Sequence, residues 1–496
     1  MKTQEIKTGS FKELYKISMP LMISFLSLFV MIFVDRIFLS HYSTSALNAA
    51  TSAGTFCWSL ALGWSTLASL AEVFVAQYNG AKQYKMLGIP VWQMIWLSLI
   101  SLLFFIPMAI WGADLLYGAA SAINYEHQYF TWTMLYSPVS VLLAAVTAFF
   151  VGQGKTSIIK WLALTGNIVN IILDPLFIFG YKGVIPSMGV KGACIATGIG
   201  IAVQAIVLFI LFIKKQNRAQ YGSGKYAFKR KAFNQCIKIG MPPALFVFVE
   251  LLGWSIFYWM MSKVSDHHLL VSSVCQSILL LFVFFGLGIE KGAAAVAANL
   301  IGAKKLDKVK NVLSSGCKMI ALFSIIICIF FVLFPDFLMN WFFKTPGAIE
   351  GGGIAALGVE ETASLKATIR TCLIFTGIYM VIEYVRWLLN GILTAAGDTV
   401  FLMITGVLCV WFFLLVPTYF LIMQQSGSME LAIMIWVAYS LLSAGVMYLR
   451  YHQGKWKKKS LLIADSEEES QEILEEESQE ALEEDILPTP ESIPEE

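Results

Sequence analysis

Residues 17–39 read ISMPLMISFLSLFVMIFVDRIFL, a run in which one Asp and one Arg are the only charged residues. A helix needs about 20 predominantly apolar residues to cross the hydrocarbon core of a bilayer. The run is too long for the apolar part of a signal peptide and is not followed by a small-residue cleavage site. It therefore predicts the first membrane-spanning helix of the protein.

The remainder of the chain has the same character. Of its 496 residues, 57% are hydrophobic and 14% are charged, whereas about a quarter of the residues of a soluble domain are charged. This composition excludes a water-soluble fold and predicts an all-α integral membrane protein with twelve transmembrane helices. The expected spans are 17–39, 47–78, 90–111, 127–152, 157–180, 191–213, 237–262, 268–301, 317–343, 369–393, 399–423 and 429–450.

The distribution of Lys and Arg predicts the orientation of these spans. With twelve spans, both termini lie on one side of the membrane. The termini and the loops on their side carry 26 of the 35 basic residues, and the opposite loops carry seven. Because short cytoplasmic loops are enriched in Lys and Arg, we expect a multi-pass protein of the cell (inner) membrane with both termini in the cytoplasm.

The two halves of the chain repeat each other. KISMP at 16–20 recurs as KIGMP at 238–242, and GAK at 80–82 recurs at 302–304, both at an offset of 222 residues. Each half holds six spans, so the second half enters the membrane in the same orientation as the first, which gives a parallel repeat typical of transporters. We expect an N-terminal six-helix lobe, a basic cytoplasmic linker, a C-terminal six-helix lobe and an acidic, disordered cytoplasmic tail: 1–216, 217–236, 237–456 and 457–496.

Charge and motifs exclude several classes of protein. The stretch 465–496 holds 15 acidic residues and no basic ones, which favours disorder. The basic linker is expected to lie near anionic membrane lipid, and we expect no nucleic-acid partner. The cysteines and histidines lack metal-ligand spacing, and no span carries a catalytic motif such as HExxH. We therefore expect no resident cofactor and no enzyme activity, nor do we find the ring-forming motif of a channel.

A few ionisable side chains within the spans are candidates for function, because a charge in the bilayer is costly. Asn167, Asn170 and Asp174 share one face of the fifth span, and Asp35 lies late in the first. Pro175 removes a backbone hydrogen bond, and we expect it to break the helix locally and expose backbone oxygen. Such clusters of oxygen atoms suit a hard cation or a proton.

The second half offers further candidates. Tyr379 and Glu383 share a face of the tenth span, and Glu250 lies in the seventh. Two interpretations of Glu383 stay open, because Arg386 is three residues away and can neutralise it.

Three further charged residues are predicted to have structural roles. Glu290 and Lys291 are neighbours and cannot face each other on a helix, so we expect each to find a partner on another helix. For Glu72 we expect a local hydrogen bond or contact with water.

Several motifs resemble those of the multidrug and toxic compound extrusion (MATE) family over roughly residues 10–450. The resemblance rests on MP at 19–20, AQYNGAK at 76–82, GQGKT at 152–156, NIILDPLFIFG at 170–180, GVKGA at 189–193, AT at 196–197, GMP at 240–242, IGA at 301–303 and GDT at 397–399. It implies two six-helix lobes in a V that opens alternately to either side of the membrane. It also implies efflux of cationic or amphipathic organic compounds by antiport with sodium ions or protons.

The resemblance also assigns the site residues. It places Asp35, Asn170 and Asp174 in a cation site of the N-terminal lobe, and Glu250, Tyr379 and Glu383 in one of the C-terminal lobe. Sodium is a possible occupant of either site. Small organic cations and membrane lipid are the implied partners of a chain that we expect to be a monomer. The alternatives are a flippase for a lipid-linked substrate and an exchanger for a metabolite.

Overall fold

The computed structural model describes residues 9–121, 123–181, 184–337, 359–459 and 461–462. Within these residues the protein is helical apart from turns and one isolated bridge between Tyr181 and Ile185. The described chain has twelve helices that are long and apolar enough to cross a membrane. The predicted fold class is therefore confirmed, and the protein is a multi-pass membrane protein. The predicted acidic tail lies almost entirely outside the described residues.

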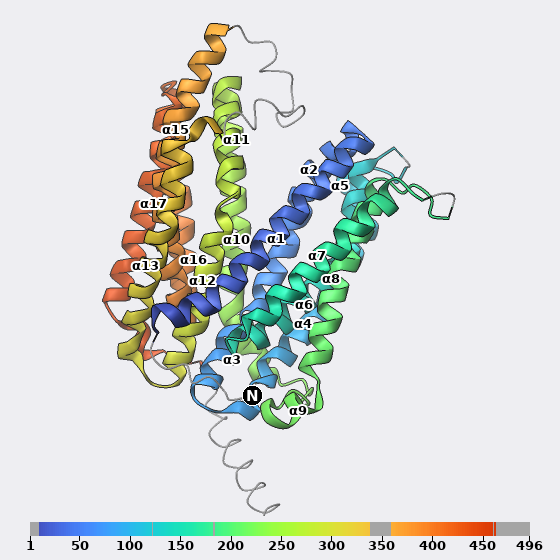
Figure 1. Ribbon diagram of the computed structural model, residues 1–496, viewed down its shortest axis with the longest axis vertical. Helices are drawn as coiled ribbons and strands as arrows, with labels where there is room; N and C mark the ends of the chain where they lie inside the picture. The colour runs from blue at the N-terminus through green and yellow to red at the C-terminus, as the bar shows by residue number, and fades with distance from the viewer. Residues whose placement is uncertain (1–8, 122, 182–183, 338–358, 460, 463–496) are drawn as a thin grey trace, which may run out of the picture.

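The helices form two lobes (Figure 1). The N-terminal lobe contains α1 (Phe11–Tyr42), α2 (Thr44–Ser69), α3 (Ala71–Gly80), η1 (Tyr84–Met86), α4 (Gly88–Pro107), η2 (Met108–Gly112), α5 (Ala113–Tyr117), α6 (Tyr125–Gly152), α7 (Thr156–Ile178), α8 (Val190–Phe212) and the short α9 (Lys215–Tyr221). The C-terminal lobe contains α10 (Arg230–Val264), α11 (Asp266–Leu280), α12 (Val283–Gly302), η3 (Leu306–Lys308), α13 (Val309–Cys328), η4 (Ile329–Leu333), α15 (Val359–Ala395), α16 (Thr399–Leu408), η5 (Cys409–Leu415), η6 (Thr418–Gln424), α17 (Met429–His452) and η7 (Lys455–Lys458).

Three details differ from the predictions. The second and eighth spans are each two helices, α2 with α3 and α11 with α12. The ninth begins at Val309 rather than 317, because Lys310 and Lys318 hide its start from a hydropathy pattern. Its predicted end, 338–343, lies outside the described residues. The expected break at Pro175 is wrong: α7 continues through it to Ile178, since a proline in the last turn removes only one hydrogen bond.

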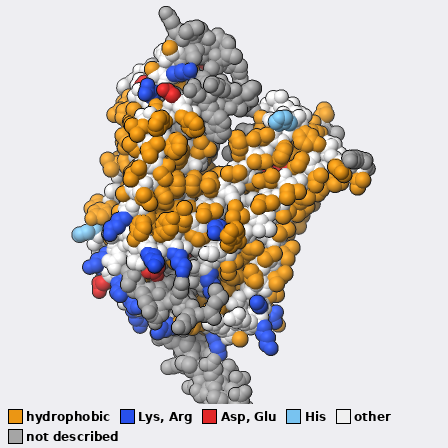
Figure 2. Space-filling view, in the orientation of Figure 1, with side chains coloured by type: hydrophobic (Ala, Val, Ile, Leu, Met, Phe, Trp, Pro, Cys, Tyr) orange, Lys and Arg blue, Asp and Glu red, His pale blue; other side chains and the backbone are white. Residues whose placement is uncertain are grey.

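The lobes meet at one end of the molecule and part toward the other (Figures 1 and 2). Helix α1 packs on both α7 and α12, and its counterpart in the repeat, α10, packs on both α16 and α2. Lys and Arg side chains gather at the end where the lobes meet, while hydrophobic side chains cover the flanks (Figure 2). We call this the basic end.

At the basic end, α3 of one lobe crosses α12 of the other with almost no side chain between them. A Cβ atom added at Gly80 would overlap the backbone carbonyl of Asn299, and one added at Gly302 would overlap that of Gln77. Gly80 and Gly302 are 222 residues apart, and so are Gln77 and Asn299, so the internal repeat relates one contact to the other. The amide of Asn79 also donates to Asn299 Oδ1 at 2.6 Å. The repeated Gly-Ala-Lys motif therefore marks a symmetric contact between the lobes.

A second contact at the basic end centres on Asp398, in the turn between α15 and α16. Arg450 donates to both of its carboxylate oxygens at 2.7 and 3.1 Å, and Lys459 donates to Oδ1 at 2.6 Å. Burial alone raises the pKa of this carboxyl group, but the hydrogen bonds from Arg450 and Lys459 outweigh burial and hold the pKa below its ordinary value of 3.8. Folding therefore stabilises the ionised form of Asp398 relative to its protonated form.

Substitution Gly80→Ala should lower the thermal unfolding temperature of the purified protein. The added methyl group forces two backbones apart, and such overpacking costs about 1–3 kcal/mol. Gly445→Ala is the matched control, because nothing lies within 4 Å of a Cβ atom at that position. Its stability should stay equal or rise slightly, as Ala is the better helix former. Equal losses in the two variants would contradict a tight crossing.

Acidification should destabilise the protein through Asp398. Because the pKa of this group is lower in the folded state, its contribution to stability is complete above pH 3.8 and is lost as the pH falls through the folded pKa. We expect Asp398→Asn to lower the unfolding temperature at pH 7 and to have a smaller effect at the lowest pH tested. A constant difference between the two proteins at every pH would contradict this assignment.

Candidate functional site

The N-terminal lobe holds a polar cluster within the membrane-spanning part of the fold. Asn167, Asn170 and Asp174 lie along the buried face of α7, and the last two are fully buried. The opposite face of α7 exposes Ile168 and Ile172, as expected of a helix with one apolar outer side. The predicted shared face of the fifth span is therefore confirmed.

Threonine 197 of α8 connects this face to α1. Its hydroxyl donates to Asp35 Oδ2 at 3.3 Å and to the carbonyl of Ala193 at 3.0 Å. The amide of Asn170 donates to Thr197 Oγ1 at 3.2 Å and to Asp174 Oδ1 at 3.4 Å. The structure thus brings Asp35, Asn170 and Asp174 together, while Asn167 lies beside them and donates to Ser27 Oγ at 2.7 Å.

Three oxygens of this cluster are buried and unpaired. Among the described residues, Asp35 Oδ1, Asn170 Oδ1 and Asp174 Oδ2 accept no hydrogen bond. Buried polar atoms in native proteins nearly always have a partner, so each exception calls for an explanation. Two carboxylates and an amide oxygen form a set of hard, partly anionic ligands, which fits a proton or a hard monovalent cation and does not fit a soft metal.

The C-terminal lobe arranges its charges differently. Arg386 donates to both oxygens of Glu383, with the shortest distance 2.6 Å, and lies 3.5 Å from Glu250 Oε1. The hydroxyl of Ser440 donates to Glu383 Oε1 at 2.7 Å. Glu383 is therefore both neutralised and fully hydrogen-bonded, which resolves the question that the sequence left open.

Glu250 and Tyr379 are the two other members of this region, and their side chains differ in solvent exposure. The Glu250 side chain, on α10, is 24% exposed, whereas Glu383 and Arg386 are buried. Tyr379 is buried one turn before Glu383 and packs against Trp436 with ring centroids 5.7 Å apart. Of this group, Glu250 is the carboxylate that remains accessible.

A further ion pair joins the two lobes. Lys291 of α12 donates to Glu72 Oε1 of α3 at 2.6 Å and to Ser69 Oγ at 3.1 Å. Asn390 donates to Glu290 Oε1 at 2.5 Å. The prediction that Glu290 and Lys291 each find a partner on another helix is confirmed. The expectation for Glu72, a local bond or water, is wrong, because its partner lies on the other lobe.

Sequence reasoning missed several residues of these clusters. Thr197 links Asp35 to Asn170, Ser27 holds Asn167, and Ser440 holds Glu383. Threonine and serine are common in membrane helices and give no signal of their own. Thr197 is the exception among these three residues, because AT at 196–197 is one of the motifs that resemble those of the MATE family.

Substitution Arg386→Met should destabilise the protein more than the double change Glu383→Gln with Arg386→Met. The single change leaves a buried carboxylate without its counter-ion, at a cost of about 3–5 kcal/mol, whereas removing both charges avoids most of it. The thermal unfolding temperatures of the purified variants measure the difference. If the single and double variants unfold at the same temperature, the two groups do not act as a pair.

Comparison with known proteins agrees with this architecture. The MatE family profile matches residues 20–176 and 242–420. The chain is 23% identical over 461 residues to the probable multidrug resistance protein NorM of Thermotoga maritima, which covers 91% of this chain and 94% of the relative. It is 26% identical over 254 residues to the multidrug export protein MepA of Staphylococcus haemolyticus, covering 50% of this chain and 54% of the relative.

Solved structures share the fold. A MOP superfamily transporter from Pyrococcus furiosus superposes with a TM-score of 0.77 at 17% identity, covering 92% of this chain and 99% of that chain. The eukaryotic MATE transporter AtDTX14 gives a TM-score of 0.73 at 17% identity, covering 90% and 96%. Since the family profile spans both lobes and more than half of the residues, the chain belongs to the MatE, or multidrug and toxic compound extrusion, family of membrane transporters, and it is not an enzyme.

Proposed function

We propose that this transporter exports cationic or amphipathic organic compounds from the cell in exchange for an entering monovalent cation. The observation that carries the proposal is the set of unpaired, buried oxygens on Asp35, Asn170 and Asp174. A membrane protein keeps such a group at a cost of several kcal/mol, and binding of one positive charge removes that cost. The coupling ion is a proton or a sodium ion.

The orientation follows from the basic end. Because Lys and Arg gather where the lobes meet and cytoplasmic loops are enriched in these residues, we place the basic end in the cytoplasm of a cell whose inner membrane holds the protein. The conformation described is then closed to the cytoplasm, and its lobes part toward the outside. A single chain supplies both lobes, so we propose that it works as a monomer.

We assign ion coupling to the N-terminal lobe. In the C-terminal lobe, Arg386 already occupies the carboxylate of Glu383 and approaches that of Glu250, so a cation there would have to displace a guanidinium group. The three charges leave the group with a net negative charge of one, and Glu250 is its accessible member. This group therefore favours positively charged solutes without being an ion site itself.

The mechanism is competition for the carboxylates of Asp35 and Asp174. When the site faces outward, the coupling ion binds between them and offsets one of the two negative charges, which weakens the attraction for a cationic compound, and the compound then leaves. When the site faces the cytoplasm, the ion dissociates and the next compound binds. Because like charges repel strongly in a low-dielectric site, the empty pair has a strong preference for one positive partner or the other.

Relatives place the proposal in context. The Thermotoga maritima relative is described as a probable multidrug resistance protein, and the Pyrococcus furiosus neighbour is described as having a binding pocket of reverse polarity that suggests a different function. In this chain two of the three unpaired oxygens of the cluster belong to carboxylates, which supports cationic substrates over an anionic lipid-linked substrate of a flippase.

Substitutions Asp35→Asn and Asp174→Asn should each slow ethidium efflux from cells that express the protein. Loss of one carboxylate charge removes at least about 1.4 kcal/mol of attraction, which corresponds to tenfold or more in ion affinity. Asp114→Asn is the control, because that carboxylate is in the same lobe but exposed. Efflux at the unmodified rate in both site variants would overturn the proposal.

The choice between a proton and sodium needs a second measurement. Proteoliposomes that contain the unmodified protein are given either a pH gradient or a sodium gradient, one at a time, and export of a labelled organic cation is followed. Only one gradient should drive accumulation. Transport that needs neither gradient would show an uncoupled exchanger instead.

A further inference from the structure

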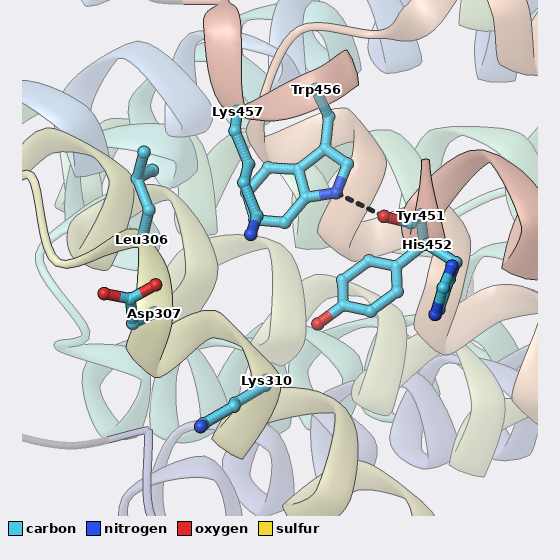
Figure 3. Close-up of a pocket in the computed structure, with 7 residues that line it drawn as sticks. All are labelled: Leu306, Asp307, Lys310, Tyr451, His452, Trp456 and Lys457. Atoms are coloured by element: carbon cyan, nitrogen blue, oxygen red, sulfur yellow. Dashed lines mark hydrogen bonds between the residues drawn. The ribbon is translucent and has the colours of Figure 1, made fainter. Parts of the chain in front are cut away.

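The chain after α17 folds back onto the basic end. Trp456 in η7 is buried, its ring stacks on Tyr451 at 5.6 Å with an interplanar angle of 13°, and its Nε1 donates to the carbonyl of Tyr451 at 2.8 Å (Figure 3). A cavity of about 260 Å³ lies between these rings and the start of α13. The residues that line it are Leu306, Asp307, Lys310, Tyr451, His452, Trp456 and Lys457. The segment is thus a distinct unit held by a small number of contacts.

The segment is anchored to the C-terminal lobe at two further points. Lys459 donates to Asp398 Oδ1 at 2.6 Å, beside the paired bonds from Arg450. The side chain of Leu461 lies so close to Gly397 that a Cβ atom there would overlap it. Together with Trp456, these contacts fix residues 455–459 and 461–462 against the α15–α16 turn.

The segment then reaches the other lobe. The backbone N–H of Leu461 donates to Gln77 Oε1 of α3 at 3.1 Å, and Gln77 Nε2 donates to the carbonyl of Ala395 at 2.8 Å. The two partners of the first bond are buried, with Gln77 1% and Leu461 8% exposed. Gln77 is also the residue whose backbone meets Gly302 at the crossing of the helices. A single side chain of the N-terminal lobe therefore holds both the turn and the C-terminal segment of the other lobe.

We propose that the described residues 455–459 and 461–462 form a C-terminal strap that latches the lobes together at the basic end. The strap is fixed to the C-terminal lobe by Trp456 and Lys459, and its Leu461 amide binds Gln77 across the lobe interface. Separation of the lobes at this end must break that bond and leave a buried donor and acceptor unpaired unless water enters. The strap therefore favours the state closed at the basic end. The inference rests on the proposed alternation between two states, but not on the substrate or the coupling ion.

A distance measurement between the lobes tests the strap in the full-length protein. Lys82→Cys and Lys304→Cys place spin labels at exposed, symmetry-related positions on the two lobes, in a background in which the exposed thiols are removed by Cys317→Ser and Cys328→Ser. Leu461→Pro removes the N–H donor. This substitution should raise the ratio of the long-distance population to the short-distance population by about fivefold. A fivefold change in this ratio corresponds to the net stabilisation by one hydrogen bond.

Matched variants distinguish loss of the bond between the strap and Gln77 from general damage to the fold. Leu461→Ala keeps the N–H and should shift the distances less than Leu461→Pro. Lys459→Met frees the strap from Asp398 and should shift them in the same direction, whereas Lys455→Met, at an exposed lysine of the same segment, should not. Unchanged distances in both Leu461→Pro and Lys459→Met would overturn the strap. Because the labels report distance without substrate, this outcome is independent of whether the transporter exports cations.

Discussion

The two lobes approach each other at one end closely enough for the backbones of their helices to touch. At the crossing of α3 and α12, the absence of a Cβ at Gly80 and Gly302 lets each helix approach the carbonyl groups of the other. The side chains of Asn79 and Gln77, which lie beside this crossing, form polar contacts between the lobes. In membranes small residues commonly mediate such packing, because there is no hydrophobic force to drive helices together.

The lobes have diverged in how they handle buried charge. The N-terminal lobe keeps two carboxylates with unpaired oxygens, and the side chains that hydrogen-bond to these carboxylates, Asn170 and Thr197, are neutral. The C-terminal lobe surrounds its carboxylates with donors, namely Arg386, Ser440 and Asn390. A buried polar network with every group satisfied is rigid, whereas unsatisfied groups are costly unless a ligand binds them. Under the proposed function, this difference assigns ion coupling to the N-terminal lobe and attraction of substrate to the C-terminal lobe.

The sequence predicted the spans and the repeat because both depend on local properties. Apolar length identifies spanning helices, and the matched Gly-Ala-Lys motifs identified the equivalent ends of α3 and α12. The polar face of α7 followed from helix periodicity alone. The interruption of the second span at Leu70 and the shifted start of α13 could not be predicted. Hydropathy does not register a change of helix direction, and basic residues lower the hydropathy at the start of a helix, so that it is taken for a loop.

The choice of partners was harder to predict than the choice of residues. Glu72 and Lys291 are more than 200 residues apart, and their pairing depends on how the lobes meet. The role of Thr197 depends on the rotation of α8 against α7. For Glu383 and Arg386, the spacing permits a pair but does not require it, and Ser440 from a third helix completes the arrangement. Tertiary contacts of this kind need coordinates.

The ion pair between Glu72 and Lys291 has a consequence for how the lobes separate. While the basic end is closed, Glu72 is buried and Lys291 is partly buried, so their attraction at 2.6 Å is stronger than that of a pair in bulk water. The first water and salt to enter weaken it abruptly through dielectric and ionic screening. Resistance to separation therefore falls as soon as separation begins, so this end tends to be either fully shut or fully hydrated, and intermediate openings are sparsely populated. Such threshold behaviour limits leakage of small ions through a protein that must pass much larger molecules.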